Sequence, residues 1–153
     1  MLPSKKDIKA FCLVSLEDMI IEFSASIKEI QLGMFEETKS SVGDKFETTR
    51  TQYQREIERL TIQLANSHTT KIRILSMGDS ESIAVGEGSL IQLKSGANSL
   101  MIYLAAAMGT LIFNGHPLHV ISIQSPLGTA LMGKKKGDSF KFNAINYSIE
   151  ELQ

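Results

Sequence analysis

Apolar residues in the first third of the chain recur at alternating steps of four and three residues. This spacing places them along one side of a helix, as in helices that pack against a partner helix. It predicts a helix from Pro3 to about Thr38, which would be roughly 50 Å long at 1.5 Å per residue. The positions of this first seam are Ile8, Cys12, Leu16, Met19, Phe23, Ile27, Ile30 and Met34.

A second apolar seam follows the short polar stretch "TKSSVGD". Its steps of three, four and seven residues again indicate a helix. Because the polar stretch is short, the two helices are expected to run antiparallel. The pattern changes around residues 66–70, so the first seventy residues are predicted to form a helical hairpin. The positions of this second seam are Phe46, Tyr53, Ile57, Leu60 and Leu64.

Beyond residue 70 the helical period gives way to short runs rich in Ile, Val, Leu and Phe, separated by turn residues. Such runs predict strands, here at 90–93, 100–105, 110–113, 119–123, 139–142 and 147–149. One short helix interrupts them at "SPLGTALMG", where Ser125 is expected as N-cap, Pro126 as the first helical residue and Gly133 as the stop.

These elements predict an α+β fold in two parts. Residues 1–70 would form an antiparallel coiled-coil hairpin with its tip at 43–47. Residues 71–153 would form a small antiparallel β-sheet domain with one short helix, and each part has enough apolar residues for a core of its own.

Composition limits the class of function. Apolar residues make up 42% of the chain and charged residues 22%, values typical of globular proteins. The net charge is −1, and the only basic cluster is the short run 134–136. Autonomous DNA or RNA binding is therefore disfavoured. Cys12 is the single cysteine, which excludes a disulfide or a cysteine-rich zinc site within the chain and favours a buried thiol.

No membrane or secretory segment is predicted. The longest apolar run, residues 100–113, is shorter than the ~20 residues that a membrane helix needs. The N-terminus has no apolar region behind its lysines, so a secretory signal is not expected. These features indicate a soluble cytoplasmic protein.

The hairpin tip carries the strongest candidate site. Asp44 and Glu47 lie three residues apart, just past a glycine. This spacing fits a capping box, in which both side chains satisfy backbone amides at a helix start. It also places two carboxylates on one side of a helix, where they could share a hard cation such as Mg²⁺. The spacing leaves both interpretations open.

Other patterns are weaker. His116 and His119 flank a turn without a third ligand nearby, which gives little support for a zinc site. The segment "VGEGS" lacks both the lysine of a phosphate-binding loop and the six-residue dinucleotide pattern, so it is interpreted as a turn.

The segment "ISIQSPLGTALMGKKKGDSFKF", residues 121–142, closely resembles the C-terminal signature of the Gre family of bacterial transcript-cleavage factors. In that family a Ser-Pro pair opens a short helix, the helix ends at Gly-Lys, and Gly-Asp then leads into a strand. The tip also resembles the family's Gly-Asp-x-x-Glu motif. The matching residues are Gly43, Asp44, Glu47, Ser125, Pro126, Gly133, Lys134, Gly137 and Asp138.

The resemblance implies a mechanism. Gre factors bind RNA polymerase through an FKBP-like C-terminal domain and insert their coiled coil into the polymerase's secondary channel. There the tip acids help to hold a shared Mg²⁺, so that the polymerase's own active site hydrolyses a backtracked RNA. This would make Asp44 and Glu47 the metal-binding acids of a factor with no complete active site of its own. Residues near the RNA 3′ end would be Lys39, Lys45 and Arg50, and polymerase contacts would include Ser125, Pro126 and Lys134.

Two alternatives remain. The residues between the tip acids, Lys45 and Phe46, differ from the usual family sequence, which fits a regulator that occupies the channel without promoting cleavage. A more distant alternative is an FKBP-type prolyl isomerase. The aromatic residues available to it are Tyr103, Phe113, Phe140, Phe142 and Tyr147, and their strand positions favour core packing.

Overall fold

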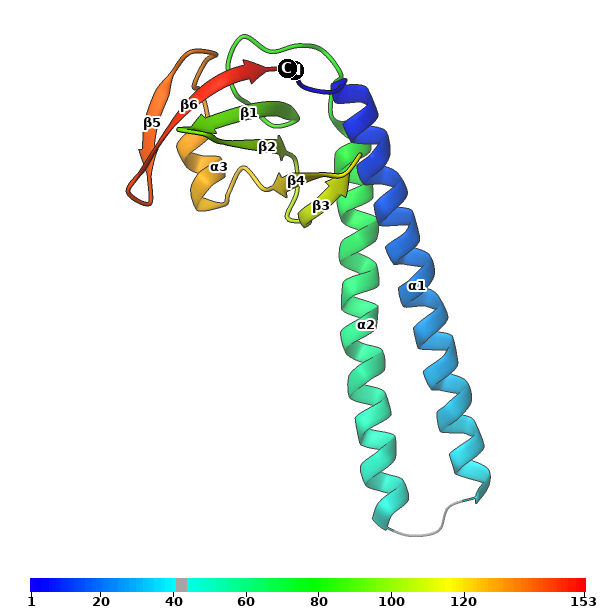
Figure 1. Cartoon of the computed structure of the whole chain (residues 1–153). Helices are drawn as coiled ribbons and strands as arrows, with labels where there is room; N and C mark the ends of the chain where they lie inside the picture. The colour runs from blue at the N-terminus through cyan, green and yellow to red at the C-terminus, as the bar shows by residue number, and fades with distance from the viewer. Residues whose placement is uncertain (41–43) are drawn as a thin grey trace. The chain divides into compact units, whose positions relative to one another are not determined.

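A computed structural model describes residues 1–40 and 44–153, with side chains described outside 38–46. Two long helices are followed by six strands, with a short helix between the fourth and fifth (Figure 1). The elements are α1 (Lys5–Ser40), α2 (Asp44–Ser76), β1 (Ser89–Ser95), β2 (Asn98–Leu104), β3 (Gly109–Phe113), β4 (His116–Ile121), α3 (Pro126–Leu131), β5 (Ser139–Phe142) and β6 (Ile145–Leu152). The predicted α+β class, a helical hairpin followed by a sheet with one short helix, is confirmed.

The chain divides into two compact units. One contains Val14–Ile72, the greater part of the two long helices. The other contains Arg73–Gln153 together with Met1–Leu13, so the first turns of α1 group with the sheet. The boundary predicted after residue 70 falls inside α2, which continues to Ser76.

The sheet is mixed. Its strand order is β3-β4-β2-β1-β6-β5, and four of its five pairs are antiparallel. The pair β2–β4 is parallel, with Met101 opposite Leu118. The predicted antiparallel sheet therefore holds for four of the five pairs, and β2–β4 is the exception because the β3–β4 hairpin folds back so that β4 lies beside β2.

The strand boundaries also differ from the predicted ones, most clearly in β4. It spans His116–Ile121, where the sequence pattern predicted 119–123. The strand ends early because the Ser122 carbonyl accepts hydrogen bonds from the backbone and hydroxyl of Ser125, which turns the chain toward α3.

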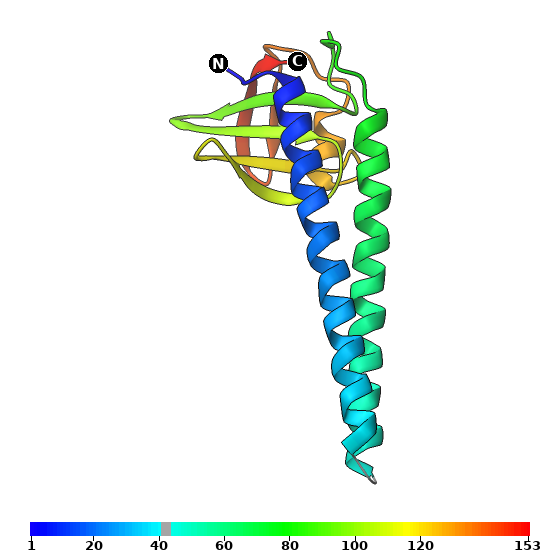
Figure 2. The same cartoon turned by 90° about the vertical axis from the view of Figure 1, so that its right-hand side faces the viewer.

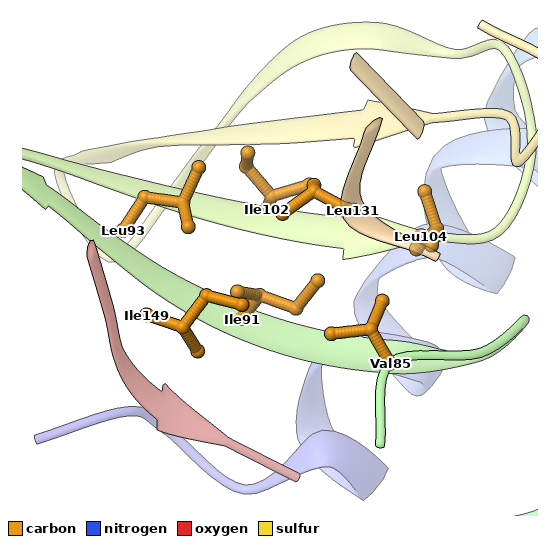
Figure 3. Packing of buried hydrophobic residues seen from close by; sticks show 7 residues of the cluster. All are labelled: Val85, Ile91, Leu93, Ile102, Leu104, Leu131 and Ile149. Atoms are coloured by element: carbon orange, nitrogen blue, oxygen red, sulfur yellow. The ribbon is translucent and has the colours of Figure 1, made fainter. Parts of the chain in front are cut away.

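One face of the sheet packs against α3. Leu131 of α3 lies over the strand residues of this face, where all seven side chains of the cluster are almost completely buried (Figure 3). Apolar burial of this kind contributes about 1.5–3 kcal/mol per side chain. The cluster consists of Val85, Ile91, Leu93, Ile102, Leu104, Leu131 and Ile149.

The opposite face buries Tyr103, Leu118 and Val120. The start of α1 lies against this face (Figure 2). There the rings of Phe11 and Phe113 meet edge to face, with centroids 5.1 Å apart. The Tyr103 hydroxyl donates to Met77 Sδ at 3.8 Å, and burial raises the pKa of Tyr103 to about 12. The sheet is thus covered on both faces.

Cys12 is fully buried, as the sequence predicted, and burial raises the pKa of its thiol to about 12. Because the thiolate is the reactive form, the thiol should be about a thousandfold less reactive than an ordinary cysteine at the same pH. We expect no labelling by iodoacetamide at pH 8 in the native protein and rapid labelling in denaturant, as measured by mass spectrometry. Rapid native labelling would contradict the burial of this residue.

Among the described side chains the hairpin seam follows the predicted period with one correction, and the predicted seam residue Phe46 lies outside them. Met19 is 39% exposed, whereas its neighbour Ile20 is 8% exposed and occupies the seam position. On α2 the buried positions continue past Leu60 through Ser67, whose hydroxyl donates to the Gln63 carbonyl at 2.9 Å. Across the helices, the Tyr53 hydroxyl donates to Glu37 at 2.9 Å.

Two tight turns of the sheet with positive φ at both central residues differ in residue choice. Asn114–Gly115 joins β3 to β4 and Asn143–Ala144 joins β5 to β6, all with positive φ. Hairpin turns of this type favour Asn-Gly because glycine adopts positive φ without a steric cost. Ala144, with φ 65°, is therefore strained.

Replacing Ala144 by Gly relieves this strain, partly offset by the greater freedom of the unfolded chain. We expect Ala144→Gly to raise the free energy of unfolding by about 0.5 kcal/mol. Gly115→Ala, at the matching position of the other turn, should lower it by a similar amount. Urea unfolding measures both, and effects of equal sign would contradict this account.

Candidate functional site: the hairpin tip and the sheet domain

The hairpin tip lies between the end of α1 at Ser40 and the start of α2 at Asp44. The side chains of Lys39, Asp44 and Lys45 lie outside the described residues, as does the predicted capping box, so their roles stay predictions. Glu47 and Arg50 lie in the first two turns of α2, and both are exposed. The Glu47 carbonyl accepts a hydrogen bond from the Thr51 hydroxyl at 2.9 Å, which is an ordinary helical contact.

The start of α2 has a defined electrostatic character. Asp44 and Glu47 both belong to its first turn. Residues three apart on a helix are neighbours on its surface. A helix N-terminus carries about half a positive charge, which favours ionised carboxylates there. The role of these two carboxylates as ligands of a divalent cation stays a prediction.

The second group of predicted residues surrounds α3. Ser125 is the N-cap, as predicted: its hydroxyl oxygen accepts from the Gly128 N–H at 3.0 Å and donates to the Ser122 carbonyl at 2.7 Å. Pro126 is the first helical residue and is exposed. Ser125 therefore shapes the turn, and Pro126 is the member of the pair that a partner can reach.

The basic turn after α3 is fixed by its backbone and by Lys134. The Val85 N–H donates to the Lys134 carbonyl at 2.7 Å, and the Gly133 N–H donates to the Val85 carbonyl at 2.9 Å. The Lys134 ammonium lies 5.5 Å from the centre of the Phe140 ring, a cation–π contact. The segment "VGEGS", which was interpreted from sequence as a turn, thus contributes Val85, whose two backbone hydrogen bonds hold the basic turn in place.

Gly128 is the residue that sequence reasoning missed. It is buried, and a Cβ built on it would lie 2.2 Å from the Ser122 carbonyl oxygen. Only glycine allows the start of α3 to approach the preceding turn this closely. The signal in the sequence is a glycine inside a short helix, where glycine is otherwise unfavourable.

The histidines and the aromatic rings have structural contacts. His119 Nδ1 lies 2.9 Å from the Thr110 hydroxyl of the neighbouring strand. Within residues whose side chains are described, no group of three or more potential ligands could hold a metal ion. Phe140 stacks on Tyr147 with centroids 5.7 Å apart, in agreement with core packing of these rings. Among the described helices, none is long and apolar enough to cross a membrane.

The fold and these two groups of residues define a class: an α+β protein with an acidic helical hairpin and a sheet domain bearing a Ser-Pro helix and a Gly-Asp strand. Residues 104–151 match the family model for the C-terminal domain of the transcription elongation factors GreA/GreB. This match agrees with the predicted resemblance to the Gre family over residues 104–151.

Comparison with solved structures finds the GreA factor homolog 1 (Gfh1) of Thermus thermophilus, with 18% identity and a TM-score of 0.39 over 92% of this chain and 94% of that one. Gfh1 of Thermus aquaticus matches with 18% identity and a TM-score of 0.37, over 90% of this chain and 91% of the other. The search of curated proteins gave no significant match.

Proposed function

We propose that this chain is a transcription elongation factor that binds RNA polymerase and promotes cleavage of backtracked RNA by the polymerase's own active site. The observation that supports the proposal is that one chain contains both a sheet domain and a helical hairpin of the kinds that such a factor needs. A Gre-type C-terminal domain is linked to a helical hairpin whose second helix begins at Asp44, with Glu47 exposed one turn later.

The tip would supply oxygen ligands to a shared magnesium ion. Mg²⁺ binds one or two protein carboxylates and keeps its other positions for water and phosphate oxygens. Asp44 and Glu47 fit that donor set, and Glu47 is open to solvent. When bound, such an ion stabilises the attacking and leaving oxygens of a phosphodiester. The chain itself would position the carboxylates, while the polymerase completes the site.

The sheet domain would provide the attachment to polymerase. Pro126 is exposed at the start of α3. Lys134, in the turn that follows α3, is half-buried against Phe140. The Lys134 carbonyl accepts from Val85 and its ammonium lies over Phe140, while Pro126 follows the N-cap Ser125. Arg50, with Lys39 and Lys45, would lie nearest the RNA 3′ end. Such a factor works where the polymerase works, in the cytoplasm.

The test uses stalled RNA polymerase complexes with end-labelled, backtracked RNA. Adding the purified protein with Mg²⁺ should shorten the RNA, and omitting Mg²⁺ should abolish the effect. Binding to polymerase is measured in parallel by co-sedimentation. Binding without any RNA shortening would overturn the cleavage role and favour a regulator that only occupies the channel. Failure to bind would overturn the proposal altogether.

A further inference from the structure

The sheet has two edges, β3 and β5, and β3 is the unprotected one. An edge strand presents unpaired backbone groups, and natural proteins usually guard such strands with charges, proline or short length. β5 has four residues and carries Lys141. β3 has the sequence GTLIF, with no charged residue and no proline. Ile112, near its middle, is 62% exposed.

The register shows which backbone groups of β3 point outward. Phe113 and His116 close the two-residue Asn114–Gly115 turn, which makes them a hydrogen-bonded pair. Hydrogen-bonded and non-hydrogen-bonded pairs alternate along an antiparallel ladder. Thr110 and Ile112 therefore direct their N–H and C=O groups away from β4. Outside the β3–β4 ladder, no backbone hydrogen bond of the described residues involves β3.

The strands at this edge of the sheet carry no charged side chain. The sequence contains no Asp, Glu, Lys or Arg between Lys94 and Lys134, a stretch that includes β2, β3, β4 and α3. Depletion of charged residues is the compositional mark of the centre of a protein interface. An extended strand could therefore pair with β3 without desolvating a charged side chain of β2, β3 or β4.

We propose that β3 is a self-association edge, on which a second copy of this chain adds its own β3 antiparallel. A two-fold axis at Leu111 places Thr110 opposite Ile112 of the partner subunit, and the same pairing repeats by symmetry. Because both residues direct their backbone groups outward, the two strands satisfy each other with about four hydrogen bonds. In this register one two-fold contact covers the exposed β3 edge of both copies, whereas an unrelated peptide would cover only one. The proposal is independent of the cleavage activity.

The register gives a test by cysteine crosslinking. At Leu111 the two copies would meet as a non-hydrogen-bonded pair, with Cα atoms about 4.5 Å apart. At Ile112 the equivalent atoms would be diagonal neighbours about 7–8 Å apart. A disulfide needs Cα atoms closer than about 7 Å. Under mild oxidation, Leu111→Cys should give at least tenfold more crosslinked dimer than Ile112→Cys. The buried Cys12 provides no competing thiol.

Mass measurement by light scattering gives a second test. The wild-type protein should show a concentration-dependent rise above its monomer mass of 16.9 kDa. Ile112→Lys should stay monomeric over the same range, since it places a charge at the pairing edge. Ile83→Lys is the matched control, because Ile83 is 87% exposed and lies outside the sheet. This control should associate as the wild type does.

Several outcomes would overturn the proposal. These are a wild-type protein that remains monomeric at millimolar concentration, association that persists in Ile112→Lys, or equal crosslinking at the two positions. A monomeric wild type whose polymerase binding is weakened by Ile112→Lys would assign the edge to the polymerase instead. The association tests contain no polymerase, so their result is separate from that of the cleavage assay.

Discussion

Asp44→Ala and Glu47→Ala should each lower the rate of RNA cleavage by on the order of 100-fold while leaving polymerase binding unchanged. Each variant removes one of two carboxylates at the start of α2, and polymerase binding is proposed for the sheet domain, far along the chain. The measurement is the rate of RNA shortening in stalled complexes at saturating protein. Because the ion is shared, each variant should also need more Mg²⁺ for half-maximal cleavage.

Glu58→Ala provides the matched control for the tip variants. Glu58 is an exposed carboxylate on the same helix, three turns and roughly 16 Å beyond Glu47. Its removal changes the net charge equally and should leave cleavage unaffected. Wild-type cleavage by both tip variants would show that the acids only cap α2. A loss caused equally by Glu58→Ala would point to a general charge effect.

Gly128→Ala should destabilise the sheet domain by about 3 kcal/mol. The added Cβ would lie 2.2 Å from the Ser122 carbonyl oxygen and 2.9 Å from Ser125 Oγ. These two atoms share the hydrogen bond that anchors the start of α3, so the strain can be relieved only by breaking that contact or shifting the backbone. Leu131 of α3 lies in the buried cluster, which would be disturbed in turn. Denaturant unfolding followed by circular dichroism measures the effect.

Gly33→Ala is the natural comparison, because the same substitution should have the opposite sign. Gly33 lies inside α1, and a Cβ built on it meets nothing within 4 Å. Alanine is favoured over glycine in a helix by about 1 kcal/mol, so the hairpin should become more stable. A Gly128→Ala protein as stable as the wild type would contradict the close approach at α3. Destabilisation by Gly33→Ala would contradict the open surface of α1.

The hairpin was largely predictable because a helix that packs along its whole length repeats its apolar positions. The sequence pattern failed at two places for identifiable reasons. Met19 and Ile20 are both apolar, so composition alone could not decide which faces inward, and the structure buries Ile20. On α2, the polar Ser67 occupies a buried position by donating to the helix backbone, which ended the apparent pattern too early.

The positions of the strands along the chain were predictable from the sequence, but their pairing and direction in the sheet were not. Short apolar runs and turn residues locate each strand, yet nothing local to β2 or β4 shows that they pair in parallel. That pairing depends on where the β3–β4 hairpin comes to lie, which is a property of the whole domain. Helix α3 was found because Ser125 and Pro126 are strong local signals, while the need for Gly128 arises from contact with Ser122.

The candidate site was predicted from two kinds of information. The spacing of Asp44 and Glu47 indicated either a cap or a metal ligand pair, and the resemblance to the Gre family favoured the second. The exposure of Glu47 agrees with both. Spacing alone could not separate them, because a helix start places carboxylates in the same positions for either purpose.

The uncharged stretch between Lys94 and Lys134 has a consequence for ionic strength. Salt shortens the range of electrostatic interactions from about 10 Å at 0.1 M to about 3 Å at 1 M, but it does not weaken apolar contacts. Contacts made by this stretch, including those of Pro126, would therefore persist in concentrated salt. The acidic tip depends on charge and would lose its effect. In rising salt the proposed contacts of Pro126 would therefore outlast those of Lys134 and of the acidic tip.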